Sequence, residues 1–214
     1  MSTPTPSEPQ GSTLSGSAAG LAGAPGAPAP ADPVTARAAK LLADRLPGAV
    51  LESSLSGRHP SLRIAPAHLV EACLLLRDDP DLRMDCLHLL SGVDWPAPTP
   101  TAPAGEMEVV YHLVSYARKP DAVTRRSPLK NDAFLVLRVR VPRSAPDVPS
   151  VMGVWAGADW HERETWDLLG IRFTGRPPLR RILLPEDWPG HPLRKDWEYP
   201  ADYHGIPIIP PEGR

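Results

Sequence analysis

The sequence predicts an α+β fold: a mixed sheet with helices packed on it, followed by a long extended C-terminal segment. Segments with apolar residues at helical spacing and runs rich in β-branched residues follow one another in the order helix, strands, helix, strands, which is typical of α+β domains. Residues 109–116 and 134–141 are apolar on both sides for part of their length, as expected for central strands covered by helices. After Phe173, repeated prolines exclude any long helix.

The first expected element is a helix that begins at Asp32-Pro33, because aspartate is a favoured N-cap residue and proline suits the first helical position. These elements together predict one α+β domain over residues 34–174. The elements expected after the first helix are strands around 49–55 and 62–64, a helix from Pro66 that buries Cys73, an apolar segment at 84–93 that is ambiguous between helix and strand, the two central strands, and a short helix at 160–169.

The short helix carries a dense set of ionisable residues. Asp159 is its expected N-cap, with Glu162 three residues on as in a capping box, and Gly170 is expected to end it. The spacing predicts an inner face of Trp166 and Leu169 and an outer face of His161, Arg163, Glu164 and Asp167.

Residues 1–33 form a leader in which 27 positions are Pro, Ala, Gly, Ser or Thr. Such a composition cannot bury enough surface to offset the entropy of ordering, so we expect a disordered leader. The whole chain has a net charge of -2, and residues 159–199 hold seven basic side chains against eight acidic ones. This balance argues against nucleic-acid binding, which needs uncompensated positive charge. Without a signal peptide or a membrane-spanning stretch, we expect a cytoplasmic protein that reaches a membrane only through a partner.

Few residues are available for a metal or catalytic site. Cys73 and Cys86 are the only cysteines, too few for an iron–sulfur cluster, which usually takes four thiolates, and we expect free thiols in a reducing compartment. His161 and Glu164 could meet on one helix face, but no further ligand motif accompanies them. Neither a GxGxxG motif nor a Walker A loop occurs, and no GxSxG elbow supports a Ser–His–Asp triad, which the sequence leaves open.

Residues 175–214 combine prolines with large apolar residues, so this extended segment must lie on its own domain or on another protein. Its charged run GHPLRKD, residues 190–196, could belong to an active site, an anion pocket or a docking surface. Because the chain supplies neither a ligand set nor an excess of positive charge, we interpret the run as part of a docking surface. Arg180 and Arg194 lie among apolar anchors, so we expect each to be paired, within the chain or across an interface.

The stretch ADWHERETWDLLGIRFTGRPPLRRILLPEDWPGHPLRKDW, residues 158–197, resembles the signature of the C subunit of the proton-pumping NADH-quinone oxidoreductase, respiratory complex I. The family's pattern has an E-R-E unit, D, G-I-x-F, G-H-P, L-R-R-I-L and D-x-x-G-H-P-L-R-K-D in this order. This chain departs from it at Arg176, where the family usually has histidine, and at Leu169, where an aromatic residue is common. The resemblance implies partner-interface or signature roles for Glu162, Arg163, Glu164, Asp167, Gly170, Phe173, Arg180, Arg181, Gly190, His191, Pro192, Leu193, Arg194, Lys195 and Asp196.

The resemblance also implies a hydrophilic subunit of the peripheral arm with no active site, cofactor or metal of its own. FMN, iron–sulfur clusters, NADH and quinone would be bound by other subunits. Its partners would be the quinone-site subunit, which is the D subunit of the complex, and other peripheral-arm subunits, with residues 175–214 as the partner-docking segment. The complex would hold it on the cytoplasmic side of the cell membrane as a peripheral protein.

Two alternatives stay open at this point. The same module is expected in related assemblies, either a membrane-bound hydrogenase or a ferredoxin-fed photosynthetic-type complex, and the electron-input site that distinguishes them lies in other subunits. The second alternative is a stand-alone soluble enzyme, which a monomeric chain that is active by itself would favour.

Overall fold

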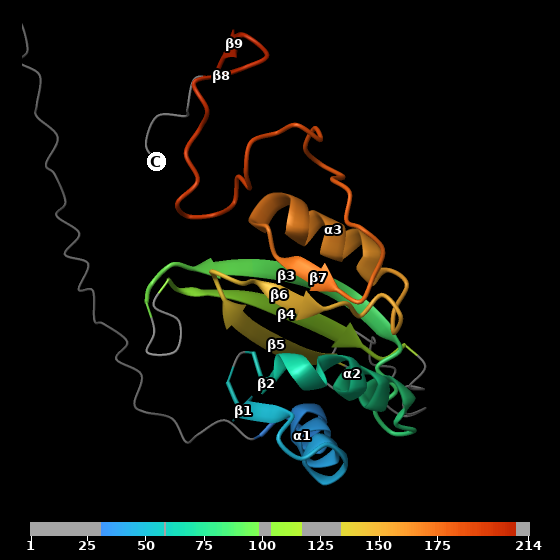
Figure 1. Cartoon of the computed structure of the whole chain (residues 1–214). Helices are drawn as coiled ribbons and strands as arrows, with labels where there is room; N and C mark the ends of the chain where they lie inside the picture. Colours follow the sequence, from blue (N-terminus) through green and yellow to red (C-terminus); the bar gives the residue numbers. More distant parts are fainter. Residues whose placement is uncertain (1–30, 58, 99–103, 117–133, 209–214) are drawn as a thin grey trace, which may run out of the picture.

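A computed structural model describes residues 31–57, 59–98, 104–116 and 134–208. At its centre lies a five-stranded sheet in the order β1-β2-β5-β4-β3 (Figure 1). Strands β2 and β5 run parallel and the other neighbours run antiparallel, which confirms the predicted mixed sheet. The two strands expected to be central correspond to β4 and β5, which lie inside the sheet. The strand bounds are Val50–Ser54 (β1), Ser61–Ile64 (β2), Cys86–Trp95 (β3), Glu106–Val114 (β4) and Phe134–Pro142 (β5).

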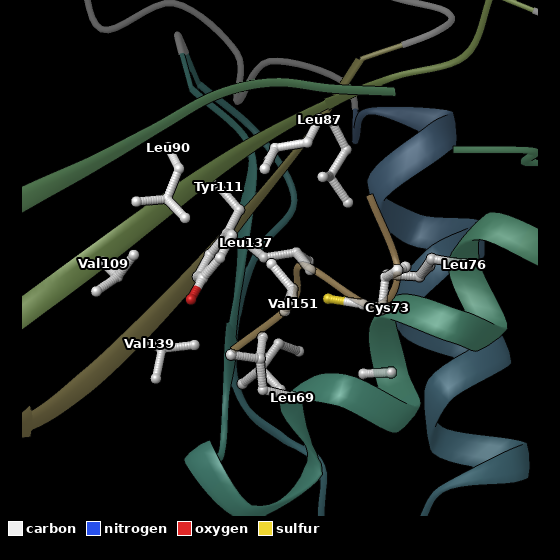
Figure 2. Packing of buried hydrophobic residues seen from close by; sticks show 14 of the residues in the cluster. Leu69, Cys73, Leu76, Leu87, Leu90, Val109, Tyr111, Leu137, Val139 and Val151 are labelled. Atoms are coloured by element: carbon white, nitrogen blue, oxygen red, sulfur yellow. The ribbon is translucent and has the colours of Figure 1, made fainter. Parts of the chain in front are cut away.

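One face of this sheet forms the core of the domain with the helices. Along β4, Met107, Val109, Tyr111 and Leu113 are fully buried, and the residues between them point to the opposite face because side chains alternate along a strand. The buried face shares one core with the helices. Figure 2 shows Tyr111 in this core together with residues of the second α-helix and of β5.

Local sequence explains where the first two helices begin. Helix α1 (Pro33–Arg45) starts after Asp32, whose carboxylate accepts a 2.7 Å hydrogen bond from the Thr35 N–H, so the predicted N-cap is confirmed. Helix α2 (Leu69–Asp78) follows a 3-10 turn, η1 (Pro66–His68). The predicted helix from Pro66 therefore begins as a tighter turn and becomes α-helical three residues later.

Both cysteines are free, as expected. Cys73 is fully buried on α2, and Cys86, at the start of β3, is partly buried. Burial raises the pKa of both thiols, and the charge of Asp85 adds to the effect at Cys86. A thiol with a raised pKa carries little thiolate, so neither cysteine has the character of a nucleophile.

The ambiguous segment at 84–93 is mostly strand β3, which pairs with β4 along its length. Helix α3 (Ala158–Leu169) crosses the buried face of β3 at Gly92. A Cβ atom at this glycine would lie 2.5 Å from Leu169 Cδ1 and 2.9 Å from Thr165 Cγ2. The missing side chain therefore allows the helix to approach the sheet closely.

Helix α3 begins two residues earlier than predicted. Gly157 is its N-cap and forms no side-chain capping bond, so the prediction of Asp159 as N-cap is wrong. The Asp159 carboxylate instead pairs with Arg176. Gly170 ends the helix as predicted, with a φ of 72° in the left-handed region that favours glycine.

The chain leaves the domain through a short parallel pair, β6 (Asp147–Pro149) and β7 (Arg172–Thr174). Residues 175–208, which we call the C-terminal arm, then run along α3 and past its end, and only their last part, with the β8–β9 hairpin, lies away from the sheet (Figure 1). Their regular structure is one small hairpin, β8 (Asp202–Tyr203) and β9 (Ile206–Pro207). The predicted extended C-terminal segment is thus observed as far as residue 208. The expected leader falls almost entirely outside the described residues, as does the end of the chain after residue 208.

Candidate partner-docking site

Asp167 is the point at which the C-terminal arm is attached to α3. Its Oδ2 atom accepts hydrogen bonds from the backbone N–H groups of Ile182, Leu183 and Leu184, at 3.0, 2.9 and 3.1 Å. Its Oδ1 atom accepts one from Arg181 at 2.7 Å. The predicted outer-face position is correct with respect to the sheet, but Asp167 is fully buried because the arm covers it.

The environment of Asp167 favours its ionised form. Burial by itself raises the pKa of a carboxyl group, but the N–H donors of Leu183, Leu184 and Ile182 and the Arg181 guanidinium outweigh it and lower the pKa of Asp167. Several donors converging on one carboxylate hold a backbone stretch that has no helix or sheet partner. Asp167 therefore takes the place of secondary structure for the start of the arm.

The GHPLR part of the charged run binds the C-terminal end of α3. His191 Nδ1 lies 2.9 Å from the Asp167 carbonyl oxygen, the Leu193 N–H donates to the Leu168 carbonyl at 3.0 Å, and Arg194 Nε donates to the Leu169 carbonyl at 2.7 Å. These carbonyls belong to the last turn of the helix, which has no partners of its own. The positive Arg194 also lies at the negative end of the helix dipole.

His191 is held in one tautomer by this arrangement. A carbonyl oxygen can only accept, so Nδ1 carries the proton. Burial lowers the pKa of His191, and the nearby charges of Arg194 and Arg181 act in the same direction, which favours the neutral ring. Gly170 makes room for it: a Cβ atom there would lie 2.5 Å from His191 Cδ2 and 2.8 Å from Arg194 Nη2.

Arg181 connects two parts of the arm with the helix. Besides Asp167, its guanidinium donates to the carbonyls of Trp188 and Gly190 at 3.0 and 3.1 Å. It also lies 5.7 Å from the centre of the Trp166 ring, within the range of a cation–π contact. Arg181 therefore fixes the loop that precedes the charged run.

The end of the charged run is attached to the sheet through Asp94 on β3. The buried Asp94 carboxylate accepts from Arg143 at 2.7 and 3.0 Å and from the Lys195 N–H at 2.8 Å. Arg143 also pairs with Asp196. These carboxylates raise the pKa of Arg143, and the three charges bridge the strand to the arm. Asp94 and Arg143 were not identified as site residues from the sequence. The available signal was that Asp94 is two residues from Gly92 and therefore lies on the same, core-facing side of β3.

Glu162 and Arg176 form a second buried group at the other end of α3. The fully buried Glu162 carboxylate accepts from the Ser150 hydroxyl at 2.7 Å, the Val151 N–H at 2.8 Å and Arg176 at 2.7 Å. Burial raises the pKa of Glu162, and these three donors oppose the rise. The Arg176 side chain is 3% exposed and also reaches Asp159. The arginine found at the histidine position of the family pattern thus supports the carboxylate of the E-R-E unit.

The remaining signature residues differ in their exposure. Arg163 lies 5.1 Å from the centre of the exposed Trp160 ring and donates to the carbonyls of Arg180 and Arg181. Within the part of the chain that the structure describes, the exposed Arg180 side chain forms no ion pair, so the expected pairing of Arg180 is not found there. Phe173 is buried, His191, Pro192 and Arg194 are half-buried, and Glu164, Gly190, Leu193, Lys195 and Asp196 are exposed.

The far part of the arm is held by aromatic side chains. The Trp188 ring lies 5.0 Å from the Tyr203 ring and 6.4 Å from the Trp197 ring, and the Tyr203 hydroxyl donates to Asp187 at 2.7 Å. The arm is therefore ordered by its own contacts, yet it displays large apolar side chains. The exposed ones are Leu183 (59%), Leu193 (50%) and Ile206 (69%).

Metal ligands and membrane spans are both missing from the described residues. No three His, Cys, Asp or Glu side chains gather there as metal ligands. Among the helices of the same residues, none combines the length and apolar character needed to cross a membrane.

Comparisons with known proteins agree with the signature. Residues 62–203 match the family described as "Respiratory-chain NADH dehydrogenase, 30 Kd subunit". The C subunit of the NADH-quinone oxidoreductase of Acidothermus cellulolyticus is 38% identical over 200 residues, covering 91% of this chain and 95% of that protein. The corresponding C subunit of Roseiflexus sp. strain RS-1 is 44% identical over 151 residues, covering 71% and 76%.

A solved structure shares the fold. It is a chain of the membrane-bound sulfane sulfur reductase, an archaeal respiratory membrane complex, with a TM-score of 0.56 and 20% identity over 78% of this chain and 86% of that chain. The family match includes most of the domain and the arm as far as Tyr203. The chain therefore belongs to the family of the respiratory-chain NADH dehydrogenase 30 Kd subunit, which includes the C subunits of NADH-quinone oxidoreductases.

Proposed function

We propose that this chain is a non-catalytic structural subunit in the peripheral arm of a proton-translocating NADH-quinone oxidoreductase. Its C-terminal arm positions the quinone-site subunit, the D subunit of that complex, while electrons pass from NADH to quinone. FMN, the iron–sulfur clusters and the quinone site belong to other subunits. The complex holds the chain on the cytoplasmic side of the cell membrane, where it reaches the lipid only through its partners.

One observation carries this proposal: the arm is anchored firmly but leaves three of its large apolar side chains exposed. Its polar groups bind the end of α3 and Asp94, whereas Leu183, Leu193 and Ile206 are at least half exposed. Full burial of such a side chain stabilises by roughly 1.5–3 kcal/mol. Three of them on a pre-ordered segment suit a partner surface, because little entropy is lost on binding.

The ionisable signature residues form hydrogen bonds within the chain, which supports a structural role for them. Asp167, His191 and Arg194 each bind backbone groups of this chain, and Glu162 is enclosed by Ser150 and Arg176. A catalytic acid or base must reach a substrate proton. Side chains that are fully occupied with backbone groups and buried partners are poorly placed for that task.

The proposal is tested by making the arm polar without disturbing its anchors. The triple variant Leu183→Ser, Leu193→Ser, Ile206→Ser is expected to keep the melting temperature of the isolated chain, since these side chains are exposed. It is expected to bind the quinone-site subunit at least about tenfold more weakly, because apolar burial at the interface is lost. Affinity is measured by calorimetry with the purified quinone-site subunit of the same organism.

The matched control carries the same change at exposed leucines of the sheet. Leu51 and Leu89 are 53% and 43% exposed, and the double variant Leu51→Ser, Leu89→Ser should bind as the wild type does. Equal affinities for the triple variant and the wild type would refute the role of the arm.

A further inference from the structure

The side chain of Arg180 forms no ion pair within the described part of the chain. Its side chain is exposed and meets no carboxylate there, while its two arginine neighbours are occupied. Arg181 binds Asp167, and Arg163 donates to the carbonyls of Arg180 and Arg181. A guanidinium group that is fully hydrated is stable without a partner, but the Arg180 side chain lines a hollow in the surface.

The hollow lies between the arm and α3, which contributes Trp166 to its lining. The prediction that Trp166 belongs to the inner face of the helix is wrong, because its ring is half-buried and contacts Arg181 and His191 of the arm. Its volume is about 460 Å³. The Trp166 ring, covered in part by the Arg181 guanidinium at 5.7 Å, and the side chain of Leu179 give it apolar surface. Its complete lining is Trp166, Pro178, Leu179, Arg180, Arg181 and Glu186.

A tryptophan and an arginine that are typical of binding surfaces lie next to Arg180. Trp160 is 63% exposed and lies 5.1 Å from the guanidinium of Arg163, which in turn is bonded to the backbone of Arg180. Tryptophan and arginine are the residues most enriched among those that dominate protein interfaces. An exposed tryptophan that an arginine holds in place is costly for solubility and suited to contact with a partner.

The charged residues of the lining are Arg180, Arg181 and Glu186. Arg181 pairs with Asp167, which is fully buried and also binds three backbone N–H groups. Among the described residues, no ion pair joins Arg180 to Glu186 or to another carboxylate. The Arg180 guanidinium therefore lacks a bound counter-charge there, and it borders an apolar surface on which a charged partner would lose water.

We propose that this hollow receives an acidic side chain, Asp or Glu, of the quinone-site subunit, and that Arg180 pairs with its carboxylate. A planar guanidinium binds a carboxylate through two parallel hydrogen bonds. The methylene groups of the acidic residue lie against Trp166 and Leu179. This inference rests on the proposed function, because it names a contact between the arm and the same partner.

The test compares charge variants of Arg180 in the full chain. Arg180→Glu is expected to weaken binding to the purified quinone-site subunit at least about tenfold, since two negative charges would meet in a partly desolvated site. Arg180→Lys keeps the charge but not the two-pronged geometry, so its affinity should lie between those of wild type and Arg180→Glu. All three proteins should melt at the same temperature, because the side chain is exposed and unpaired in the described residues.

The control is Arg45→Glu, the same change at another exposed arginine that lines a surface pocket. That pocket contains three carboxylates, of Glu71, Asp78 and Asp79, against one arginine. It is therefore not suited to an acidic ligand, and binding should be unchanged. Equal weakening by Arg45→Glu and Arg180→Glu would mean that only the overall charge matters, and the inference would be wrong.

Two further results separate the inference from the proposed function. If the triple serine variant binds weakly while Arg180→Glu binds as wild type does, the arm docks but the hollow is not its acidic-residue site. Deletion of residues 209–214, which include Glu212, should leave the effect of Arg180→Glu intact. If the deletion abolishes that effect, the carboxylate comes from this chain's own end and the inference is overturned.

Discussion

The Asp167 carboxylate accepts hydrogen bonds from three successive backbone N–H groups and from Arg181. A helix or a sheet would normally supply those partners to residues 182–184, but the prolines around them prevent both. A single ionised side chain on α3 thus fixes the start of the arm. Its importance lies in its charge and in its four acceptor positions, because an uncharged isostere offers only half of them.

We predict that Asp167→Asn destabilises the arm strongly. The amide nitrogen would face either Arg181 or the N–H groups of residues 182–184, so one set of donors loses its acceptor. Breaking a buried charge pair in this way costs roughly 3–5 kcal/mol. Urea unfolding followed by tryptophan fluorescence measures the loss. The control Asp147→Asn breaks an exposed pair with Arg172 and should cost about 0–1 kcal/mol; similar losses for both variants would contradict the assignment.

The same carboxylate predicts a pH dependence. The pKa of Asp167 is lower in the folded chain than its ordinary value of about 3.9. The stability that it supplies is therefore complete above that value and is lost as the pH falls through the folded pKa. The difference in unfolding free energy between wild type and Asp167→Asn should be constant near neutral pH and shrink below about pH 4. A difference that persists unchanged at lower pH would show that the charge is not what holds the arm.

At the scale of the element, α3 joins the sheet on one side to the arm on the other. Gly92 lets its inner face approach β3, and Gly170 lets the arm approach its C-terminal end. The carbonyls of that end are bonded to Leu193, Arg194 and His191. The helix terminus is therefore completed by a segment more than twenty residues further along the chain.

Two glycines allow the contact at the end of α3 to be separated from backbone strain. Gly170 and Gly175 have φ angles of 72° and 75°, but a Cβ atom would meet His191 and Arg194 only at Gly170, and nothing within 4 Å at Gly175. Alanine at either position costs about 1 kcal/mol for the left-handed backbone. We predict that Gly170→Ala is clearly more destabilising than Gly175→Ala in urea unfolding. Equal costs would mean that His191 and Arg194 do not lie against the helix end.

Patterns that are local in sequence were sufficient to predict most elements. Asp32-Pro33 starts a helix because its chemistry acts within one turn, and alternation along 109–116 and 134–141 identifies strands because it reflects only the two faces of a sheet. The partners of the buried acids could not be found in this way. Asp94 is bound by Lys195, 101 residues away, and by Arg143. Asp167 is polar on an outer helix face, and only the path of the arm decides that it is buried.

At the scale of the whole molecule, the chain consists of a domain with a core and an arm without one. Among the described residues, the buried apolar ones end at Phe173. The arm is held by polar contacts to α3 and β3, by its own aromatic rings and by Leu179, which is partly buried against the core. The part of the arm after Tyr199, described as far as residue 208, makes none of these polar contacts to α3 and β3, so it contributes little to the folding of the domain. The ordered exposed side chains of the arm are therefore better explained by contact with a partner than by a role in the fold of the domain.

The isolated chain is predicted to bind no metal, flavin or nucleotide in stoichiometric amounts. The described residues present no group of three metal-ligating side chains, and the sequence lacks a phosphate-binding glycine motif. Elemental analysis and an absorbance spectrum of the purified full chain measure this. An iron–sulfur or flavin chromophore that copurifies with the chain alone would contradict the prediction.

Truncation after Tyr199 separates the two parts of the molecule most directly. It removes the β8–β9 hairpin, including Ile206 and the Tyr203 ring that packs on Trp188, but no residue of the domain core and none of the bonds to Asp167 or Asp94. We predict that the melting temperature of the isolated chain changes by no more than a few degrees, whereas co-purification with the quinone-site subunit is lost or sharply reduced. Thermal melting followed by circular dichroism and affinity capture of the tagged partner give the two readings. If the melt collapses while binding survives, the hairpin is part of the folding unit of its own domain, and docking must be assigned to another surface.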